Sequence, residues 1–321
     1  MQSEQWADTR QFLRRAAPRL KGMPAVEISV DADLVRRLLI AQFGPLDAET
    51  AAAPLTFLAT GWDNAMFRLG DHHVVRLPVR SVSAPLIAKE SQWLPLLASD
   101  LPVDCPVPIF TGSPQEEFPW PWTIVPWVGG QVVDALPVQD RSHLVDDLAD
   151  VMIKLHRPAP GDAPVNPVRG VPLQERESAL EARWPMIIEL YGTTAAGRLR
   201  DVWADGLAAR RWTGSPVWVH GDPHPFNLLH HEGSLSGLID FGDLGAGDPA
   251  SDLATAWLTF DGPQRARFQR RIAAYGDVDE DIWRRSAAWA VVLWSAFATD
   301  PESRATFAVI LRHTLGQLAG P

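Results

Sequence analysis

Residues 220–243 read HGDPHPFNLLHHEGSLSGLIDFGD, and this is the most informative stretch of the chain. The apolar run at 217–219 predicts a buried strand, so the polar groups that follow emerge at the end of that strand. Pro223 and Pro225 stiffen the next loop, because each fixes its own φ and restricts the residue before it. Two further apolar runs, separated by a turn that contains Gly, predict a hairpin that ends at Asp240.

The spacing of three polar residues in this stretch suits metal-assisted phosphoryl transfer. Asp222 would accept the proton of the substrate hydroxyl, while Asn227 and Asp240 would hold Mg²⁺ on the nucleotide phosphates. Taken singly, each residue is equally well explained as a turn former or a loop cap. Those explanations do not require a second Asp at the close of an apolar run, so the joint pattern favours phosphoryl transfer.

The chain resembles the aminoglycoside phosphotransferases and related small-molecule antibiotic kinases. The matching motifs are His220-Gly221-Asp222 with Asn227, and Ile239-Asp240-Phe241-Gly242-Asp243 followed by Gly247-Asp248-Pro249. The resemblance implies an α+β, two-lobed protein-kinase-like fold with a small antiparallel-sheet N-lobe and a mainly helical C-lobe. It also places the catalytic base at Asp222 and the magnesium ligands at Asn227 and Asp240, in agreement with the spacing.

The length of 321 residues, with 46% apolar content, suits two lobes of one catalytic unit. We expect a nucleotide-binding lobe with an N-terminal helix over 1–128, and a helical lobe with the catalytic loop and substrate site over 129–321. The single Cys105 excludes an intramolecular disulfide, and the N-terminal region lacks the apolar core of a signal peptide. The apolar run 287–298 is too short to span a bilayer. A cytoplasmic enzyme without a membrane anchor is expected.

The formal net charge is −10, and the second half of the chain carries most of the acidic excess. Such a surface would attract a cationic substrate and repel nucleic acid, so no nucleic-acid partner is expected. The requirement for solubility explains the same balance equally well.

The N-terminal part has the order of a kinase N-lobe. Helical spacing over 32–43 predicts one helix, and three strands are expected over 55–60, 65–69 and 73–77. The loop from Gly61 to Asn64 would lie over the nucleotide phosphates, with its backbone N–H groups facing the anion. An ordinary hairpin turn explains these residues almost as well.

The third strand carries Arg76 where protein kinases have a phosphate-binding Lys. Arg76 could bind phosphate with Glu90 as its partner, since guanidinium groups form bidentate phosphate contacts. Glu90 falls on a helix expected over 83–98. The competing interpretation is a surface ion pair on a strand edge.

Two more strands are expected over 106–110 and 122–127, and the second should lead into the hinge between the lobes. The hinge backbone binds the adenine edge in kinase-like folds, which makes Val125, Trp127 and Val128 the candidates for that contact.

Helices are expected over 141–156, 173–191 and 194–211. His156 is interpreted as a satisfied helix-end residue outside the site. Six acidic side chains on the last two helices, among them Glu181 and Asp205, could bind ammonium groups of a substrate or lie on solvated helix faces.

The predicted enzyme is therefore a Mg²⁺-dependent phosphotransferase that uses ATP or GTP and acts on a hydroxyl of a small molecule. An aminoglycoside or other antibiotic is the favoured acceptor, and a macrolide or a metabolic alcohol such as choline or a sugar is the alternative. Two rival classes stay open. One is a hydrolase with a metal bound by His220, Asp222 and His224, and the other is a catalytically inactive nucleotide-binding protein.

Overall fold

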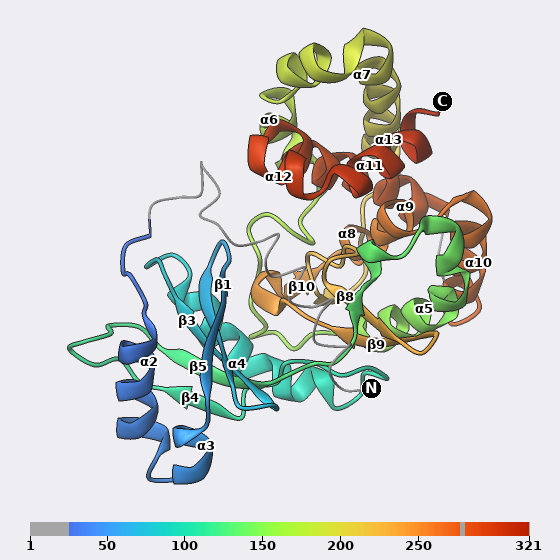
Figure 1. Cartoon of the computed structure of the whole chain (residues 1–321). Coiled ribbons are helices and arrows are strands. Elements are labelled where there is room, and N and C mark those ends of the chain that lie inside the picture. The colour runs from blue at the N-terminus through green and yellow to red at the C-terminus, as the bar shows by residue number, and fades with distance from the viewer. Residues whose placement is uncertain (1–25, 277–279, 321) are drawn as a thin grey trace. The chain divides into compact units, whose positions relative to one another are not determined.

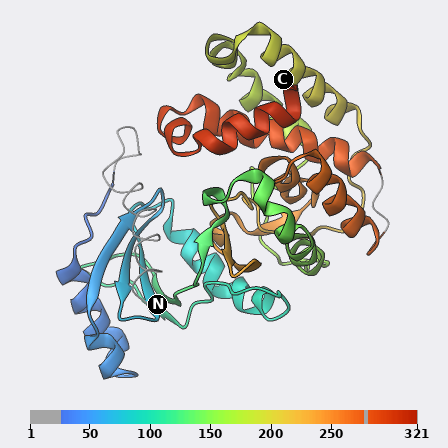
Figure 2. The same cartoon turned by 45° about the vertical axis from the view of Figure 1, so that its right-hand side comes forward.

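The computed structural model describes residues 26–276 and 280–320 and divides into two compact units (Figure 1 and Figure 2). The first unit extends to Ser99 and also includes Cys105–Gly129, and the second includes Asp100–Asp104 together with the chain from Gly130 onward. The short segment 100–104 belongs to the second unit because Asp104 pairs with its sheet. The Asp104 N–H donates to the Ser236 carbonyl, and its own carbonyl accepts from the Leu238 N–H, both at 3.0 Å.

The first unit is built on an antiparallel five-stranded sheet in the order β1-β2-β3-β5-β4. Its strands are β1 (Leu55–Thr60), β2 (Asn64–Leu69), β3 (His73–Pro78), β4 (Phe110–Gly112) and β5 (Trp122–Pro126). The three consecutive strands predicted from the sequence, and the strand at 122–127, are confirmed. The strand predicted over 106–110 is wrong, because Pro106 and Pro108 cannot donate to a ladder and pairing begins only at Phe110.

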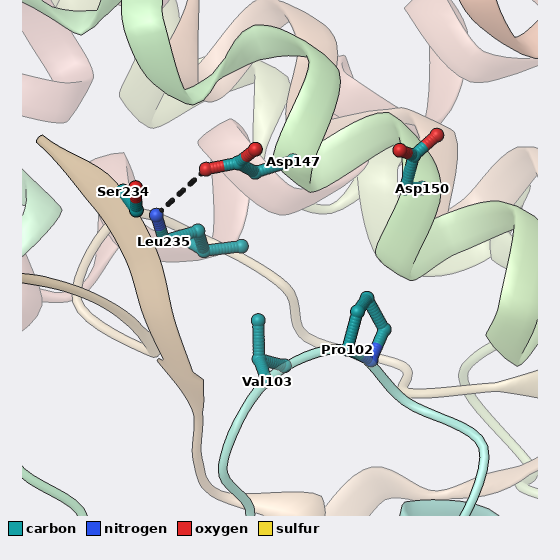
Figure 3. A pocket seen from close by; sticks show the side chains of 6 residues that line it. All are labelled: Pro102, Val103, Asp147, Asp150, Ser234 and Leu235. Atoms are coloured by element: carbon teal, nitrogen blue, oxygen red, sulfur yellow. Dashed lines mark hydrogen bonds between the residues drawn. The ribbon is translucent and has the colours of Figure 1, made fainter.

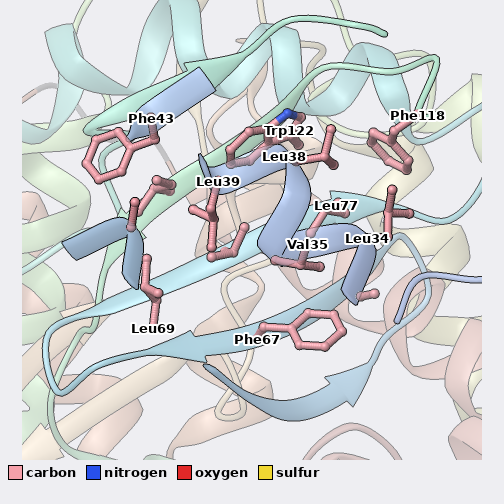
Figure 4. Packing of buried hydrophobic residues seen from close by; sticks show 14 of the residues in the cluster. Leu34, Val35, Leu38, Leu39, Phe43, Phe67, Leu69, Leu77, Phe118 and Trp122 are labelled. Carbon is pink, nitrogen blue, oxygen red and sulfur yellow. The ribbon is translucent and has the colours of Figure 1, made fainter. Parts of the chain in front are cut away.

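Helices pack on this sheet to form the core of the first unit (Figure 4). They are α2 (Ala32–Leu38), the π-helical turn η1 (Leu39–Phe43) and α3 (Ala48–Ala52), while α4 (Ala84–Ala98) contacts β5 outside this cluster. The Asp31 side chain caps α2 by accepting from the Leu34 N–H at 2.8 Å. The predicted helix over 32–43 is thus present, but its last turn widens to π. Its buried face, which includes Val35 and Leu39, contacts Phe67 and Trp122 on the sheet.

The second unit contains the predicted hairpin. Strand β8 (Leu228–His231) pairs with β9 (Ser234–Leu238), and β6 (Gln131–Val132) pairs with the other edge of β8. The turn between β8 and β9 has positive φ at Glu232 (48°) and Gly233 (81°), as tight hairpins require. A separate two-stranded ladder joins β7 (Val217–Val219) to β10 (Gly245–Gly247).

Helices make up most of the second unit, and α11 packs against α7 within it (Figure 1). The elements are η2 (Val133–Ala135), η3 (Val138–Leu144), α5 (Val145–Leu155), η4 (Leu173–Arg176), α6 (Glu177–Glu181), α7 (Trp184–Ala208), η5 (Phe241–Asp243), α8 (Ala250–Leu253), α9 (Thr255–Thr259), α10 (Gly262–Ala273), α11 (Glu280–Thr299), α12 (Pro301–Thr306) and α13 (Ala308–Ala319). The apolar run 287–298 is confirmed as part of a buried helix. Within the described ranges, no helix is long and apolar enough to cross a membrane.

Two helix boundaries differ from prediction. The helix expected from 141 starts as the 3-10 turn η3 and becomes α-helical only at Val145. The pair expected over 173–191 and 194–211 is instead a 3-10 turn, a short helix and one long helix. That long helix, α7, is kinked at Gly192, whose φ of 85° lies outside the helical region.

Candidate active site

A buried carboxylate fixes the start of the catalytic loop. The backbone N–H groups of His220 and Gly221, directly after β7, donate to the two oxygens of Asp252 at 2.7 and 2.9 Å. Asp252 lies on α8 and is fully buried, and the His156 ring nitrogen Nε2 lies 3.3 Å from its Oδ2. Sequence reasoning missed this contact, because Asp252 lies 32 residues after His220 in the chain and His156 was interpreted as a satisfied helix-end residue outside the site.

The His220 side chain connects the loop to the end of the hairpin. Its Nε2 lies 3.0 Å from the carbonyl of Ile239, and its Nδ1 accepts from the Asp222 N–H at 3.2 Å. These two bonds require the neutral tautomer with its proton on Nε2. Burial, despite nearby carboxylates, lowers the pKa of His220 and favours that neutral form. Because both ring nitrogens are committed, His220 is not available as a metal ligand.

The loop turns sharply at Gly221, which has a φ of 91°. A Cβ there would lie 2.6 Å from the carbonyl oxygen of Asp243, much closer than real Cβ contacts. Gly is therefore required on both conformational and steric grounds.

Asp222 is flanked by two cationic groups. His224 Nε2 lies 3.3 Å from its Oδ2, and Arg169 Nη2 lies 3.7 Å from its Oδ1. Burial alone would raise the pKa of Asp222, but the charges of His224 and Arg169 outweigh it and hold that pKa well below its usual range. The carboxylate is ionised at neutral pH and points a negative charge at whatever group approaches it.

The two predicted magnesium ligands lie at the two ends of the hairpin that follows this loop. The Asn227 side-chain Nδ2 donates to the Asp222 carbonyl at 2.9 Å, which leaves its Oδ1 as the oxygen available to a metal. The Ile239 N–H donates to the Asn227 carbonyl at 3.0 Å, so that Asp240 follows directly. Asp240 has an exposed side chain and a left-handed backbone, with φ 66° and ψ 69°. Its charge helps to raise the pKa of His224 against the effect of burial.

The donor set fits magnesium. A carboxylate and an amide oxygen are the hard oxygen ligands that Mg²⁺ accepts in proteins, with water and phosphate oxygens completing its shell. Among the residues that the structure describes, no group of three or more His, Cys, Asp or Glu side chains is arranged to hold a metal. The alternative of a metal bound jointly by His220, Asp222 and His224 therefore has no geometric support.

Arg169 is a site residue that sequence reasoning missed. Besides its contact with Asp222, its Nε lies 3.2 Å from Asp243 Oδ2. Asn166 fixes this segment by donating to the Asp243 carbonyl at 2.8 Å and accepting from the Arg169 N–H at 3.1 Å. The segment lies within a Pro- and Gly-rich connector without periodicity, so no sequence pattern indicated its place.

The first unit contains the predicted ion pair. Arg76 on β3 donates to Glu90 on α4 through two nitrogens, at 2.5 and 3.1 Å. The two residues are 8% and 1% exposed, so the pair is buried and the surface-pair interpretation is wrong. Glu90 is the predicted partner of Arg76.

The loop from Gly61 to Asn64 forms a closed turn between β1 and β2. The Gly61 N–H donates to the Asn64 carbonyl at 2.9 Å. Arg80 binds the loop through the Trp62 carbonyl and the Asp63 carboxylate, and the hydroxyl of Ser83 also donates to Asp63. The buried Oδ1 of Asn64 accepts no hydrogen bond from the described part of the chain. These hydrogen bonds are those of a hairpin turn whose conformation is fixed by Arg80 and Ser83.

The three residues predicted to bind adenine at the hinge differ in side-chain burial and in whether their backbone groups are already hydrogen-bonded. Val125 is buried within β5 and pairs with Val74. The Trp127 N–H donates to the His72 carbonyl at 2.7 Å, so this amide is already used within the unit. The Trp127 ring also stacks with a guanidinium, that of Arg68, at 3.9 Å. Val128 is half-buried.

The linings of two cavities in the second unit do not include Asp222, Asn227 or Asp240. One of about 200 Å³ is lined by Pro102, Val103, Asp147, Asp150, Ser234 and Leu235 (Figure 3). There the Asp147 carboxylate accepts from the Leu235 N–H at 2.9 Å. A larger cavity of about 420 Å³ adjoins β10 and the connector, and the buried pair of Asp248 and Arg285 contributes to its wall.

The fold and the loop chemistry together define a kinase-like phosphotransferase. The chain belongs to the phosphotransferase enzyme family, whose model matches residues 54–289. The fold is the predicted two-lobed one, shared with solved antibiotic phosphotransferases.

Three similar proteins illustrate these relationships. An aminoglycoside 3'-phosphotransferase of Escherichia coli is 39% identical over 66 residues, which are 21% of this chain and 24% of that protein. The chain thus spans about a quarter of the length of that curated relative. The GDP complex of an aminoglycoside 2'-phosphotransferase-IIIa has a TM-score of 0.66 at 19% identity, covering 86% of this chain and 97% of its own. Macrolide 2'-phosphotransferase MphH from Brachybacterium faecium has a TM-score of 0.55 at 19% identity, covering 89% and 99%.

Proposed function

We propose that the protein transfers the γ-phosphate of ATP or GTP to a hydroxyl group of a small molecule in the cytoplasm, where both nucleotides are available. The observation that carries this proposal is the ionised Asp222 on a loop fixed by Asp252, with Asn227 bonded to the same loop. A general base must be held within hydrogen-bonding reach of the hydroxyl and must be unprotonated, and Asp222 meets the second condition directly.

Asp222 would orient the acceptor hydroxyl and take its proton late in the transfer. His224 keeps the carboxylate in place through its 3.3 Å contact and shields it with a ring that is 5% exposed. Asn227 Oδ1 and the Asp240 carboxylate would hold Mg²⁺, which when bound neutralises phosphate charge. In the first unit, Arg76 held by Glu90 supports phosphate binding by a guanidinium in place of the usual Lys.

The ionised Asp222 favours a working enzyme over an inactive nucleotide-binding protein, because this residue would serve as the base and is not needed to hold a nucleotide. The Arg76–Glu90 pair, satisfied by two hydrogen bonds, supports nucleotide binding in either case. For the acceptor, an aminoglycoside or another antibiotic is proposed because similar proteins act on aminoglycosides and macrolides by name. A metabolic alcohol such as choline or a sugar is the alternative class.

The test is γ-phosphate transfer from ATP and GTP to a panel that contains kanamycin, a macrolide, choline and a hexose, followed by mass spectrometry for one added phosphate. Asp222→Asn should lower kcat by about 10³-fold or more while circular dichroism shows an unchanged fold. The exposed Asp205→Asn is the matched control and should leave kcat unchanged. Equal nucleotide turnover by wild type and Asp222→Asn would refute the proposal.

A further inference from the structure

Arg169 contacts two carboxylates that belong to different segments of the second unit. It lies in the Pro- and Gly-rich connector between α5 and η4. Its Nη2 lies 3.7 Å from Oδ1 of Asp222 in the catalytic loop, and its Nε lies 3.2 Å from Oδ2 of Asp243 at the end of η5. Asp240 is the N-cap of the same short turn. A single guanidinium therefore joins the loop of the catalytic base to the segment that carries a predicted magnesium ligand.

Asn166 fixes the connector to this segment. Its side-chain Nδ2 donates to the backbone carbonyl of Asp243 at 2.8 Å and to the Asp243 carboxylate at 3.1 Å. Its Oδ1 accepts from the N–H groups of Val168 and Arg169, at 2.8 and 3.1 Å. Asn166 is buried, so these bonds form away from bulk water. The backbone from which the Arg169 side chain starts is thus tied to Asp243.

Backbone hydrogen bonds hold the connector on both sides of Arg169. The Ala246 N–H donates to the Pro164 carbonyl, and the Asp248 N–H donates to the Gly170 carbonyl, both at 2.8 Å. Gly170 has a φ of 64°, which residues with a side chain rarely adopt. Because the chain is anchored before and after Arg169, a movement of its backbone away from the catalytic loop would break these bonds.

Negative charge gathers where these segments meet. Asp222 and Asp243 both contact Arg169, and Asp240 comes three residues before Asp243. In residues 26–276 and 280–320, no other Lys or Arg nitrogen lies within 4 Å of the carboxylate of Asp222 or Asp243. Like charges repel each other, and the repulsion is stronger where water is excluded. Arg169 is thus the guanidinium that offsets this repulsion between the two segments.

The carboxylate of Asp222 is held by other groups than its backbone. The Asp222 carbonyl accepts from Asn227 Nδ2 at 2.9 Å, which fixes the main chain. Of the two carboxylate oxygens, Oδ2 lies 3.3 Å from His224 Nε2. The buried Oδ1 accepts no hydrogen bond from the described part of the chain and lies beside Arg169. The orientation of the base therefore depends on the charge of Arg169 on one side and on the His224 ring on the other.

We propose that Arg169 is a positioning residue for phosphoryl transfer, which holds the carboxylate of Asp222 against segment 240–243 so that the base and the magnesium ligand keep a fixed spacing. Its effect comes through Asp222 and Asp243. This inference rests on the proposed phosphotransferase function and adds a residue to it. A displacement of about 1 Å in a reacting group can lower the rate on the order of 100-fold, so the loss of Arg169 should be visible in kcat.

The kinetic test uses the best acceptor of the panel above, with Mg²⁺ and ATP or GTP. Arg169→Gln removes the charge and should lower kcat about 100-fold, while KM for acceptor and nucleotide stays within about twofold. Arg169→Lys keeps the charge and should hold kcat within about tenfold of the wild type. An unchanged kcat in Arg169→Gln would overturn the inference. Equal losses in the Gln and Lys variants would do the same, because they would indicate a role in packing alone.

Arg267→Gln is the matched control. Arg267 also joins two segments through a carboxylate, since its Nη2 lies 2.5 Å from Asp146 Oδ2 between α10 and α5. Neither residue takes part in the proposed site, so this variant should leave kcat and KM unchanged. A fall in kcat as large as that of Arg169→Gln would show a general sensitivity to lost ion pairs and would remove the specific role of Arg169.

A double variant tests whether Arg169 and Asp243 act as one unit. Asp243→Asn should lower kcat, because the guanidinium loses one of the two carboxylates that it joins. Its addition to Arg169→Gln should cause no more than about a further twofold loss, since residues that act together have non-additive effects. Losses that multiply would show that Asp243 acts independently of Arg169, which contradicts the proposed link between the two segments.

Hydrogen exchange followed by mass spectrometry tests the inference without turnover. In Arg169→Gln, peptides from 220–227 and 164–170 should exchange about tenfold faster, because the contact between the two segments is lost. Peptides from α10 should keep the wild-type rate, and Arg267→Gln should give the reverse pattern. Wild-type exchange over 220–227 in Arg169→Gln would overturn the inference. Absence of phosphoryl transfer to every acceptor would refute the proposed function instead, since exchange does not depend on catalysis.

Discussion

The carboxylate of Asp252 accepts a hydrogen bond of 2.7 Å from the backbone N–H of His220. Its second oxygen accepts from the next N–H, that of Gly221, at 2.9 Å. Asp252 has no exposed surface, so these bonds and the nearby His156 ring are what offset the cost of burying its charge. Asp222 comes directly after these two amides. Asp252 therefore sets the direction in which the catalytic loop leaves β7.

The first prediction concerns Asp252→Asn. The amide removes the charge, and its NH₂ group must face a backbone donor, so the variant should lose about 3–4 kcal/mol of unfolding free energy. It should also lower kcat, because the loop loses its fixed direction. Urea unfolding and initial rates measure the two effects. The exposed control Asp205→Asn should lose less than about 1 kcal/mol. A loss no larger than that in Asp252→Asn would contradict the role given to this carboxylate.

A second prediction compares two glycines with positive φ. Gly221→Ala should cost about 3 kcal/mol or more and lower activity, since its Cβ would meet the Asp243 carbonyl at 2.6 Å. Gly233→Ala, at a φ of 81° with open space around its Cβ, should cost only about 1 kcal/mol of backbone strain. Thermal unfolding of both variants gives the comparison. Similar losses at the two positions would show that backbone conformation alone, without the steric contact, accounts for Gly221.

The sequence could predict the elements whose signal is local. Period-two and helical spacing located the first three strands, the catalytic hairpin and the buried helix α11, and the Asp222-to-Asn227 spacing located the loop. The pairing of Arg76 with Glu90 was predicted from the sequence. The burial of this pair was not, because it depends on β3 lying inside the sheet between β2 and β5.

The remaining site residues depend on tertiary contacts. Arg169 lies in a segment without periodicity, and it reaches Asp222 because Asn166 and Gly170 pack the connector onto η5 and β10. Asp252 acts on a loop about thirty residues earlier in the chain. Neither placement is encoded by spacing within a single element, since each arises only when two distant segments meet.

The third prediction separates stability from nucleotide binding in the first unit. Arg76→Met should cost about 3–5 kcal/mol, because it leaves the Glu90 carboxylate buried and unpaired. The double variant Arg76→Met/Glu90→Met should recover most of that loss, since two apolar side chains replace a desolvated pair. KM for ATP and GTP should stay raised by about tenfold or more in both variants. A normal KM in the double variant would show that Arg76 has only a structural role.

The exposed pair of Arg37 and Glu117 is the control for that cycle. Its two side chains are 57% and 52% exposed, and its nitrogen-to-oxygen distance is 2.7 Å. Its removal should leave both stability and KM essentially unchanged, because solvent screens an exposed ion pair.

The last prediction concerns pH and stability. Burial, with a smaller effect from the Arg141 charge, lowers the pKa of His313 from 6.5 to about 4, and Nε2 of its neutral ring lies 3.1 Å from the Phe260 carbonyl. The unfolded chain therefore binds the proton more strongly, so stability should fall between pH 6.5 and 4 by up to about 3 kcal/mol. His313→Gln keeps an N–H donor without titrating and should flatten this part of the urea-unfolding profile. The exposed His231→Gln should keep the wild-type slope, and an unchanged slope in His313→Gln would assign the acid sensitivity to other groups.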